Sequence, residues 1–498
     1  MEIYLLILRM GGGPTKFGRI IEHKIPFKNP NKITYNMTKH RDIQTLFGEL
    51  RSHIYGDSSH SDWGIELIDI LTKARNMSPT DYYQYWLPYL DQQSLNWPQP
   101  ICTFRDPSKL DAMLRDLQTP GLFGLDIGAR NDAVVELSEF NNPNSICELC
   151  MSGWDLTESK ISEFLVALGK LRNLTKLNLN SNLFGCNGFV RLLELKSLDH
   201  LAKIDVSANE INECEVDQLS HLSLFNQLIS IDISFNATKG TVLRSVMLSQ
   251  QNKIKEFVAR KCKIPGDRLR VPTANDRPSG IAELDLFVNN IGDCGASFIA
   301  SQPFYSTISK LDIGANNISM DGLSEICNST TLLSLNELNL WLNKIGDSGA
   351  QTIANSKNMT HLTKLNLRNT NIGDSGFASL VSSSELKNLV DLNVSQNNIS
   401  LENPTYLVHL PEKSSIRRLS LSSNRIDDQG ARVIADHLSL ENLEFLDLHY
   451  NNITTEGIQY ILASKRLYKL KKIVCDQDDK AGKTHDYFNP RGVLIDYH

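Results

Sequence analysis

The chain has 498 residues, a formal net charge of −6 and a sequence pI near 6.1. This slightly acidic balance gives no indication of nucleic acid or of an anionic membrane surface as a partner, and we expect neither. No stretch approaches the roughly 18 apolar residues that a membrane-spanning helix needs. The apolar stretch Tyr4–Leu8 is short and follows Glu2 rather than a basic segment, so we do not interpret it as a signal peptide.

Nine cysteines are scattered along the chain, without the clusters that close the ends of extracellular repeat proteins. This usage is typical of a reducing compartment, and we expect a cytoplasmic protein. Export into a host cell without a cleaved signal peptide stays open as the alternative. Cys147 and Cys150 form one C-x-x-C, but a zinc site needs a second pair, so we expect no metal there.

Residues 1–120 contain no repeat and are expected to form a mostly helical capping region. Helical candidates lie at residues 41–53, 62–75, 79–90 and 107–117. Aromatic residues crowd the third of these, namely Tyr82, Tyr83, Tyr85, Trp86 and Tyr89. Two interpretations stay open: the aromatic set covers the exposed edge of the first unit of a repeat array, or residues 1–120 are an independent functional module.

A unit of about 27 residues repeats over most of the remaining chain. A degenerate unit is expected from Leu122, and the register locks from Ile146, after which the units step by 28, 27, 27 and 26 residues and then by 27 throughout. The first positions are Ile146, Leu174, Leu201, Leu228, Ile254, Ile281, Ile308, Leu335, Leu362, Leu389, Ile416, Leu443 and Leu470. These thirteen units predict a repeat array over residues 121–478, followed by a C-terminal tail over residues 479–498.

Each unit follows the pattern L-x-x-L-x-L-x-x-N, as in Leu335–Asn343. Its L-x-L part has the period of a strand with one buried face, so positions 1, 4 and 6 should form the core. The asparagine at position 9 should hydrogen-bond the backbone of the turn that follows the strand. Beyond the turn, an apolar stripe within residues 350–354 predicts an amphipathic helix, with Asp347 as its cap. A strand, a turn and a helix in every unit predict an α/β solenoid.

Positions 3 and 5 should lie on the open face of the sheet. Position 3 alternates in charge over six consecutive units, which predicts a ladder of surface ion pairs: Glu283, Lys310, Glu337, Lys364, Asp391 and Arg418. Position 5 is mostly Asp or Asn, at Asn178, Asp205, Asp232, Asp285, Asp312, Asn339, Asn366, Asn393 and Asp447. No base, nucleophile or phosphate loop accompanies this row of carboxylates, so we do not predict catalysis from it.

Positions 7 and 8 carry large apolar and cationic side chains in one region of the array. We predict that this region binds a protein partner, through Phe235, Arg260, Lys261, Phe287, Val288, Trp341, Leu342 and Arg368. Phe287 and Trp341 sit two strands, or about 10 Å, apart, and we expect Gly314 to leave a gap between them. His449 and Tyr450 form a second candidate contact point. The alternative is that a tail or loop of the same chain covers these residues.

The segments Leu335–Gly349 and Leu362–Gly376 resemble the leucine-rich repeat of the ribonuclease-inhibitor type, and the resemblance covers residues 146–478. It implies an α/β horseshoe with an inner parallel sheet, outer helices and protein binding on the concave face. The chain departs from ribonuclease inhibitor, which alternates two repeat lengths and is rich in cysteine. Its abundant Asn, Ile, Lys and Ser resemble leucine-rich-repeat effectors of intracellular bacteria.

These observations predict a monomeric, non-enzymatic interaction protein that needs no cofactor and docks a folded protein on its concave face. The rival hypothesis places an enzymatic or regulatory activity, such as regulation of a GTPase, in residues 1–120. In that case the repeats would select the substrate.

Overall fold

The structure is a computed structural model that describes residues 101–104, 123–127, 146–213, 216–272, 277–402, 414–438, 440–476, 487–489 and 491–497. The chain divides into two compact units. Unit 1 comprises Met1–Asp155, Ser162–Leu179 and Ser197–Leu201, and unit 2 comprises Leu156–Ile161, Asn180–Lys196 and Ala202–His498. The helices expected within residues 1–120, with the aromatic set at Tyr82–Tyr89, lie outside the described residues.

In unit 1, four parallel strands are described: β1 (Ile101–Phe104), β2 (Phe123–Ile127), β3 (Ile146–Cys150) and β4 (Lys176–Asn178). Each strand pairs with the next along the chain. The strand β2 falls where the degenerate unit was expected from Leu122. The strand β1 lies in the segment that the sequence assigned to the N-terminal cap, so parallel pairing begins about 20 residues earlier than residue 121.

In unit 2, a parallel sheet runs from β5 to β15 and is extended by β17, which pairs with β15. The strands are β5 (Lys203–Asp205), β6 (Ser230–Asp232), β7 (Glu256–Val258), β8 (Glu283–Asp285), β9 (Lys310–Asp312), β10 (Glu337–Asn339), β11 (Lys364–Asn366), β12 (Asp391–Asn393), β13 (Arg418–Ser420), β14 (Phe445–Asp447), β15 (Lys472–Cys475) and β17 (Leu494–Tyr497). A short strand, β16 (Tyr487–Phe488), pairs antiparallel with β17. The C-terminal tail therefore continues the sheet.

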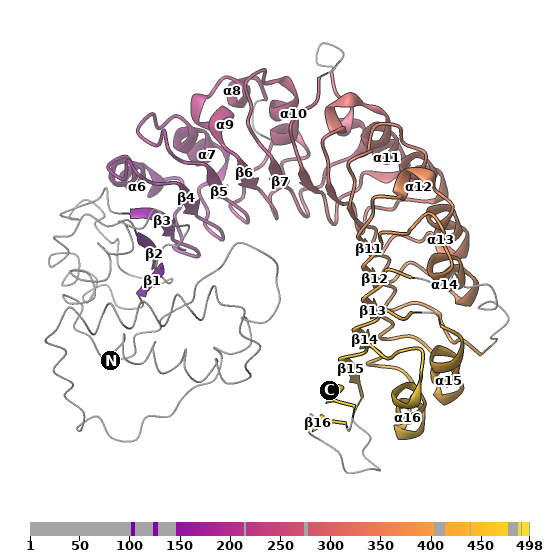
Figure 1. Cartoon of the computed structure of the whole chain (residues 1–498). Helices are drawn as coiled ribbons and strands as arrows, with labels where there is room; N and C mark the ends of the chain where they lie inside the picture. Colours follow the sequence, from indigo (N-terminus) through magenta and orange to yellow (C-terminus); the bar gives the residue numbers. More distant parts are fainter. Residues whose placement is uncertain are drawn as a thin grey trace, which may run out of the picture. The chain divides into compact units, whose positions relative to one another are not determined.

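The helices lie on the outer side of unit 2, and the strands line its inner side (Figure 1). They are α7 (Gly185–Leu193), α8 (Val216–Ser220), α9 (Ser223–Gln227), α10 (Thr241–Leu248), α11 (Gly292–Ser301), α12 (Met320–Cys327), α13 (Gly346–Ala354), α14 (Asp374–Val381), α15 (Asp428–His437) and α16 (Thr455–Ala463); α6 (Ile161–Leu168) precedes them. Short 3₁₀ helices occur at Gly266–Leu269, Pro303–Tyr305 and Lys357–Met359. This is the predicted α/β solenoid of the horseshoe type.

The core forms where the repeat pattern placed it. In the unit that starts at Leu335, the side chains of Leu335, Leu338 and Leu340 are buried, and so are Ala350 and Ile353 on the inward face of α13. The strands of successive units pair in register, with Leu338 opposite Leu311 and Leu365. Burying the same positions in every unit aligns each strand with the next, because a shift by one residue would turn the leucines outward.

The asparagines at position 9 form a ladder through the turns. The Oδ1 atom of Asn343 accepts hydrogen bonds from the backbone N–H groups of Asn316 and Ile318, at 3.1 and 3.0 Å. Its Nδ2 atom donates to the carbonyl oxygens of Ile313 and Leu340, at 2.9 and 3.0 Å. One side chain thus satisfies buried backbone groups of two adjacent turns, which is the role the sequence predicted.

Asp347 does not cap its own helix, so that expectation was wrong. The N-cap of α13 is Ile345, and no side chain there makes a cap hydrogen bond. Instead the Asp347 carboxylate accepts from the backbone N–H of Gly373 and from the hydroxyl of Ser375, each at 2.6 Å. These groups belong to the start of α14, so the carboxylate serves the helix of the next unit.

None of the helices in the described ranges is long and apolar enough to cross a membrane. Of the cysteines, Cys147, Cys150, Cys262, Cys294, Cys327 and Cys475 are free, whereas Cys186 is disulfide-bonded.

Candidate functional site

The candidate residues lie where the chain turns at the end of each strand. The side chain at position 5 accepts a hydrogen bond from the backbone N–H at position 7, as Asp285 does from Phe287 at 3.1 Å and Asn339 from Trp341 at 3.0 Å. This explains why Asp and Asn are frequent at position 5: their short side chains close the turn locally. Position 8 then adopts a left-handed backbone, for example at Leu342, where φ is 62°. The turn sets the direction of the side chains at positions 7 and 8.

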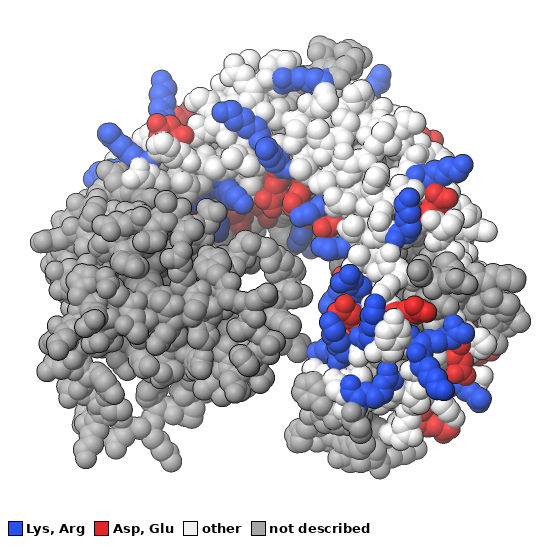
Figure 2. All heavy atoms as spheres, in the orientation of Figure 1, with Lys and Arg blue, Asp and Glu red and all other residues white. Residues whose placement is uncertain are grey.

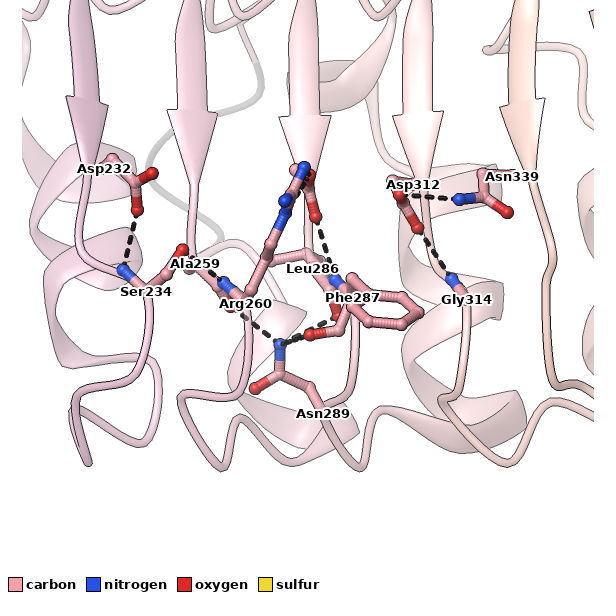
Figure 3. Close-up of polar contacts among 11 residues, drawn as sticks. Asp232, Ser234, Ala259, Arg260, Leu286, Phe287, Asn289, Asp312, Gly314 and Asn339 are labelled. Carbon is pink, nitrogen blue, oxygen red and sulfur yellow. Dashed lines mark hydrogen bonds and ion pairs between the residues drawn. The ribbon is translucent and has the colours of Figure 1, made fainter. Parts of the chain in front are cut away.

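Phe287 and Trp341 stack on each other. Their ring centroids are 5.0 Å apart and their planes differ by 16°. The Phe287 ring extends toward Gly314, which lies in the turn between the two aromatic residues (Figure 3). A Cβ atom at Gly314 would come within 2.9 Å of the Phe287 ring and within 3.1 Å of the Trp341 carbonyl oxygen. The expected gap is therefore filled, because the two side chains lean together over the glycine.

Arg368 completes this stack. Its guanidinium carbon lies 4.9 Å from the centroid of the Trp341 ring, and its Nε atom donates to Oε1 of Gln396 at 3.0 Å. We call Phe287, Trp341 and Arg368 the aromatic stack. All three side chains are half-buried. The Nε1 atom of Trp341 is buried and has no hydrogen-bond acceptor among the residues that the structure describes.

Arg260 is directed to the strand carboxylates rather than to the aromatic stack. Its Nε atom donates to Oδ2 of Asp285 at 2.7 Å, and this hydrogen bond raises the pKa of Arg260. The next carboxylate along the row, Asp312, accepts from the N–H of Gly314 and from Nδ2 of Asn339 (Figure 3). Burial and the nearby charge of Asp285 raise the pKa of Asp312 to about 6.

The remaining candidates form two further groups. Lys261 lies over the Phe235 ring, 5.6 Å from its centroid, and Phe235 is 58% exposed. His449 and Tyr450 stack at a centroid distance of 3.7 Å near the C-terminal end of the sheet, far along it from the aromatic stack. The structure therefore does not bring all the predicted residues into one patch.

Val288 and Leu342 stand at position 8, next to the two aromatic residues of the stack. Leu342 is 40% exposed, whereas Val288 is half-buried. Val288 holds a φ of 53°, which a β-branched side chain rarely adopts. The turn geometry thus overrides the preference of the residue.

The charges at position 3 form separate ion pairs. Lys310 pairs with Glu283 at 2.6 Å, Lys364 with Glu337 at 2.9 Å, and Arg418 with Asp391 at 3.4 Å. In Figure 2, Lys or Arg and Asp or Glu atoms lie next to each other along the inner side of unit 2. Exposed pairs of this kind contribute about 0–1 kcal/mol each, so they balance charge more than they stabilise the fold.

The described Cys, Asp and Glu side chains serve structural contacts in this region. Within the described ranges, no group of three or more His, Cys, Asp or Glu side chains is placed to hold a metal ion. Burial, with a smaller contribution from Glu148, raises the pKa of Cys147 to about 11, so its thiol stays protonated at neutral pH. The position-5 carboxylates are engaged in their own turns.

A family model described as leucine-rich repeat matches residues 331–354, 358–381, 412–435 and 439–462. The chain contains leucine-rich repeats. No curated protein matches the sequence.

Solved structures of low sequence identity resemble the chain. An internalin from Listeria monocytogenes is 18% identical, with 67% of this chain and 82% of that chain covered and a TM-score of 0.36. A structure of the yeast Rad7–Elc1 complex is 12% identical, with 86% and 96% covered and a TM-score of 0.41. A TDR receptor is 17% identical, with 78% and 70% covered and a TM-score of 0.37.

The matched leucine-rich repeats contain Trp341, Leu342 and Arg368, and also His449 and Tyr450. The other candidates lie outside the matched segments but in repeats of the same register, as the strand pairing shows. Sequence reasoning missed Gln396, which holds the Arg368 guanidinium. The only signal for it was its place at position 8 of the repeat that follows Arg368.

Proposed function

We propose that this protein is an interaction module, and that a folded protein partner docks on the inner face of unit 2 at the turns around the aromatic stack. The observation that carries the proposal is the aromatic stack itself. A Trp, a Phe and an Arg lie together on a sheet face that no helix of the described residues covers. Tryptophan and arginine are enriched among the residues that dominate binding energy at protein interfaces.

The contacts within the aromatic stack hold its three side chains in a fixed arrangement. Stacking and the Gln396 hydrogen bond fix the three side chains before a partner arrives, so less conformational entropy is lost on binding. Leu342 adds exposed apolar surface beside the stack, and Phe235 with Lys261 forms a separate exposed group on the same row of turns. The position-3 and position-5 side chains, which are paired or engaged in turns, supply a polar rim.

The finer part of the proposal concerns the repeat type. Units of 26 to 28 residues that carry α-helices on the outer side support a ribonuclease-inhibitor-type leucine-rich repeat. Export as a bacterial effector remains a prediction from the sequence, as do the monomeric state and the enzymatic or regulatory rival in residues 1–120.

The test is a comparative capture experiment with the full chain as bait. A Phe287→Ser, Trp341→Ser double variant, shown by circular dichroism to be folded, is compared with wild type and with a Leu333→Ser, Tyr468→Ser control. The control also removes two apolar side chains, each 56% exposed, but away from the strand-end turns. We expect a partner that the wild type and the control retain and that the double variant loses. Capture of the same proteins by all three baits would contradict the proposal and direct attention to residues 82–89.

A further inference from the structure

The turns beside the aromatic stack carry charge of one sign. Positions 7 to 10 of the nine repeats that start at Leu228 through Leu443 contain no Asp or Glu. The same positions contain six cations, Arg260, Lys261, Lys263, Lys344, Arg368 and Arg425. In a chain with 57 acidic and 51 basic residues, this separation of charge is not a matter of composition. We call these positions the turn strip.

Most of these cations have no carboxylate partner among the described residues. Arg260 pairs with Asp285. For the other five, the described part of the chain supplies no carboxylate within 4.0 Å, and four of them are exposed. Lys261 and Arg368 lie instead over the Phe235 and Trp341 rings, which hold them in place without cancelling their charge.

The strands beside the turn strip behave differently. There the cations at position 3 each have a carboxylate partner, and position 5 carries Asp232, Asp285 and Asp312. An acidic ligand would be repelled from this row of carboxylates and attracted to the turn strip. The charge pattern therefore favours an acidic ligand, and it favours binding of that ligand at the turn strip rather than at the strands.

We infer that the partner presents an acidic segment with an apolar residue in its middle, and that this segment lies along the turn strip. The order of the strip sets the pattern: cations at Lys261 and Arg368 bracket the Phe287–Trp341 stack. They are four repeats apart, which is about 19 Å along the sheet. An extended segment spans that distance in about six residues.

A protein segment fits this pattern better than a nucleic acid does. A nucleic-acid backbone would carry one phosphate at every nucleotide, and a groove that tracks it presents closely spaced cations. Here three cations lie in the repeat that starts at Ile254, and Lys344 and Arg368 lie in the repeats that start at Leu335 and Leu362. The two repeats between them carry neutral side chains at these positions, including Phe287, Val288, Gly314 and Ala315. This inference rests on the proposed docking of a protein on the same face.

The test uses the full chain and fluorescence anisotropy of labelled peptides. The probe is Glu-Glu-Ser-Phe-Leu-Ser-Glu-Glu. It is compared with the same peptide in which Lys replaces Glu, with the rearranged peptide Phe-Leu-Ser-Ser-Glu-Glu-Glu-Glu, and with an eight-nucleotide oligothymidylate. We expect salt-sensitive binding of the probe that is about tenfold tighter than binding of the other three ligands.

Two triple variants of equal net charge locate the binding. Lys261→Gln, Lys344→Gln, Arg368→Gln should weaken probe binding about tenfold. Lys160→Gln, Lys196→Gln, Lys357→Gln removes three exposed cations from outside the turn strip and should leave binding unchanged. Circular dichroism of both variants checks that they fold.

Any other result overturns the inference: no binding of the probe, equal binding of the lysine or rearranged peptide, tighter binding of the oligonucleotide, or equal losses in the two triple variants. If these results appear while partner capture still depends on Phe287 and Trp341, the acidic segment is wrong and the docking face stands. If capture is also independent of both residues, the proposed function fails with it.

Discussion

Successive leucine-rich repeats of this protein are joined in two different ways. We name each junction by the first residues of the two repeats it connects. At the 281/308 junction, the Asp293 carboxylate accepts three hydrogen bonds at the start of α12, from the N–H and hydroxyl of Ser319 and the N–H of Gly322, at 2.7, 2.6 and 3.1 Å. On the inner face, Glu283 pairs with Lys310.

The 335/362 junction repeats this arrangement. Asp347 accepts from Gly373 and Ser375 at the start of α14, and Glu337 pairs with Lys364. An aspartate clamp on the outer side and an ion pair on the inner side therefore join each of these two pairs of repeats.

The 308/335 junction between the two pairs is built differently. Met320 stands where the clamping aspartate is found in the neighbouring repeats, and the N–H of Gly346 donates forward to the carbonyl oxygen of Thr370 rather than back to the preceding repeat. On the inner face, the Phe287–Trp341 stack reaches over the whole repeat that starts at Ile308, so it crosses this junction as well as the 281/308 junction, with one ring contributed by each pair of repeats. Repeats of equal length are therefore joined by different contacts, and the Phe287–Trp341 stack crosses the 308/335 junction, which has no aspartate clamp.

Of the substitutions that test this difference between junctions, removal of the Trp341 ring should change the free energy of unfolding the most. Trp341→Ala takes away one half of the stack, and we expect a loss of about 3 kcal/mol in the free energy of unfolding. Urea denaturation measures the loss, and hydrogen exchange should show α13 opening more readily than α11. Phe235→Ala is the control, because that ring is 58% exposed and spans no such junction. An equal effect of both substitutions would mean that the stack does not join the repeats.

The raised pKa of Asp312 should make the stability of the same junction depend on pH. Its pKa is about 6 in the folded chain and near its ordinary value of 3.8 when unfolded, so the folded state binds the proton more tightly. The contribution of Asp312 to stability is therefore best below about pH 4, falls as the pH rises to about 6, and is constant above. We expect a fall of about 2 kcal/mol over that window.

Comparison with Asp312→Asn isolates this contribution. The variant should show a flatter dependence of stability on pH between 4 and 6, measured by urea denaturation at each pH. Parallel curves for wild type and Asp312→Asn would show that this carboxyl group does not titrate as inferred.

Breaking a clamp should cost somewhat less. Asp347→Ala leaves the N–H of Gly373 and the hydroxyl of Ser375 without their acceptor, and we expect a loss of about 1.5 kcal/mol, as for other helix caps. The control, Asp321→Ala, lies in the first turn of α12 and should cost only a few tenths of a kcal/mol through the helix dipole. Hydrogen exchange in the first turn of α14 should rise in the first variant alone.

The sequence predicted what is periodic. The register from Ile146, the buried leucines and the asparagine ladder follow from one pattern, because each of these features depends on residues at fixed positions within neighbouring units. The candidate site was predicted only as a row of residue types. Strand spacing placed Phe287 and Trp341 about 10 Å apart, and nothing in the pattern specified that their side chains lean together over Gly314.

Contacts between repeats were harder to predict than contacts within them. The residue Asp347 begins a helix, and helix capping is usually a local interaction, so the sequence suggested that it caps α13. Its partners lie 26 and 28 residues away. The sequence does contain a pattern that distinguishes the repeats. Ile-Gly-Asp occurs at residues 291–293 and 345–347, where the aspartate forms a clamp, and Ile-Ser-Met occurs at residues 318–320, where no clamp forms.

The last prediction converts the unclamped junction into a clamped one. Gly346 has a φ of 62°, so Gly346→Ser alone strains the backbone and should destabilise the chain by about 1 kcal/mol. At the 281/308 junction the equivalent position is Ser319, whose N–H and hydroxyl donate to the Asp293 carboxylate. Adding Met320→Asp to Gly346→Ser supplies the missing carboxylate and should allow the serine to adopt the same capping conformation.

The expected result is therefore a coupling between the two substitutions. The double variant should be about 1 kcal/mol more stable than the sum of the two single variants predicts, which a double-mutant cycle measures by urea denaturation. The matched control cycle combines Met320→Asp with Gly292→Ser. Gly292 begins α11, which precedes Met320 by one repeat, whereas Gly346 begins α13, which follows Met320 by one repeat. Coupling in the first cycle alone would establish that the aspartate acts on the helix that follows it. Additivity in both cycles would mean that the two kinds of junction differ in more than the residues at these two positions.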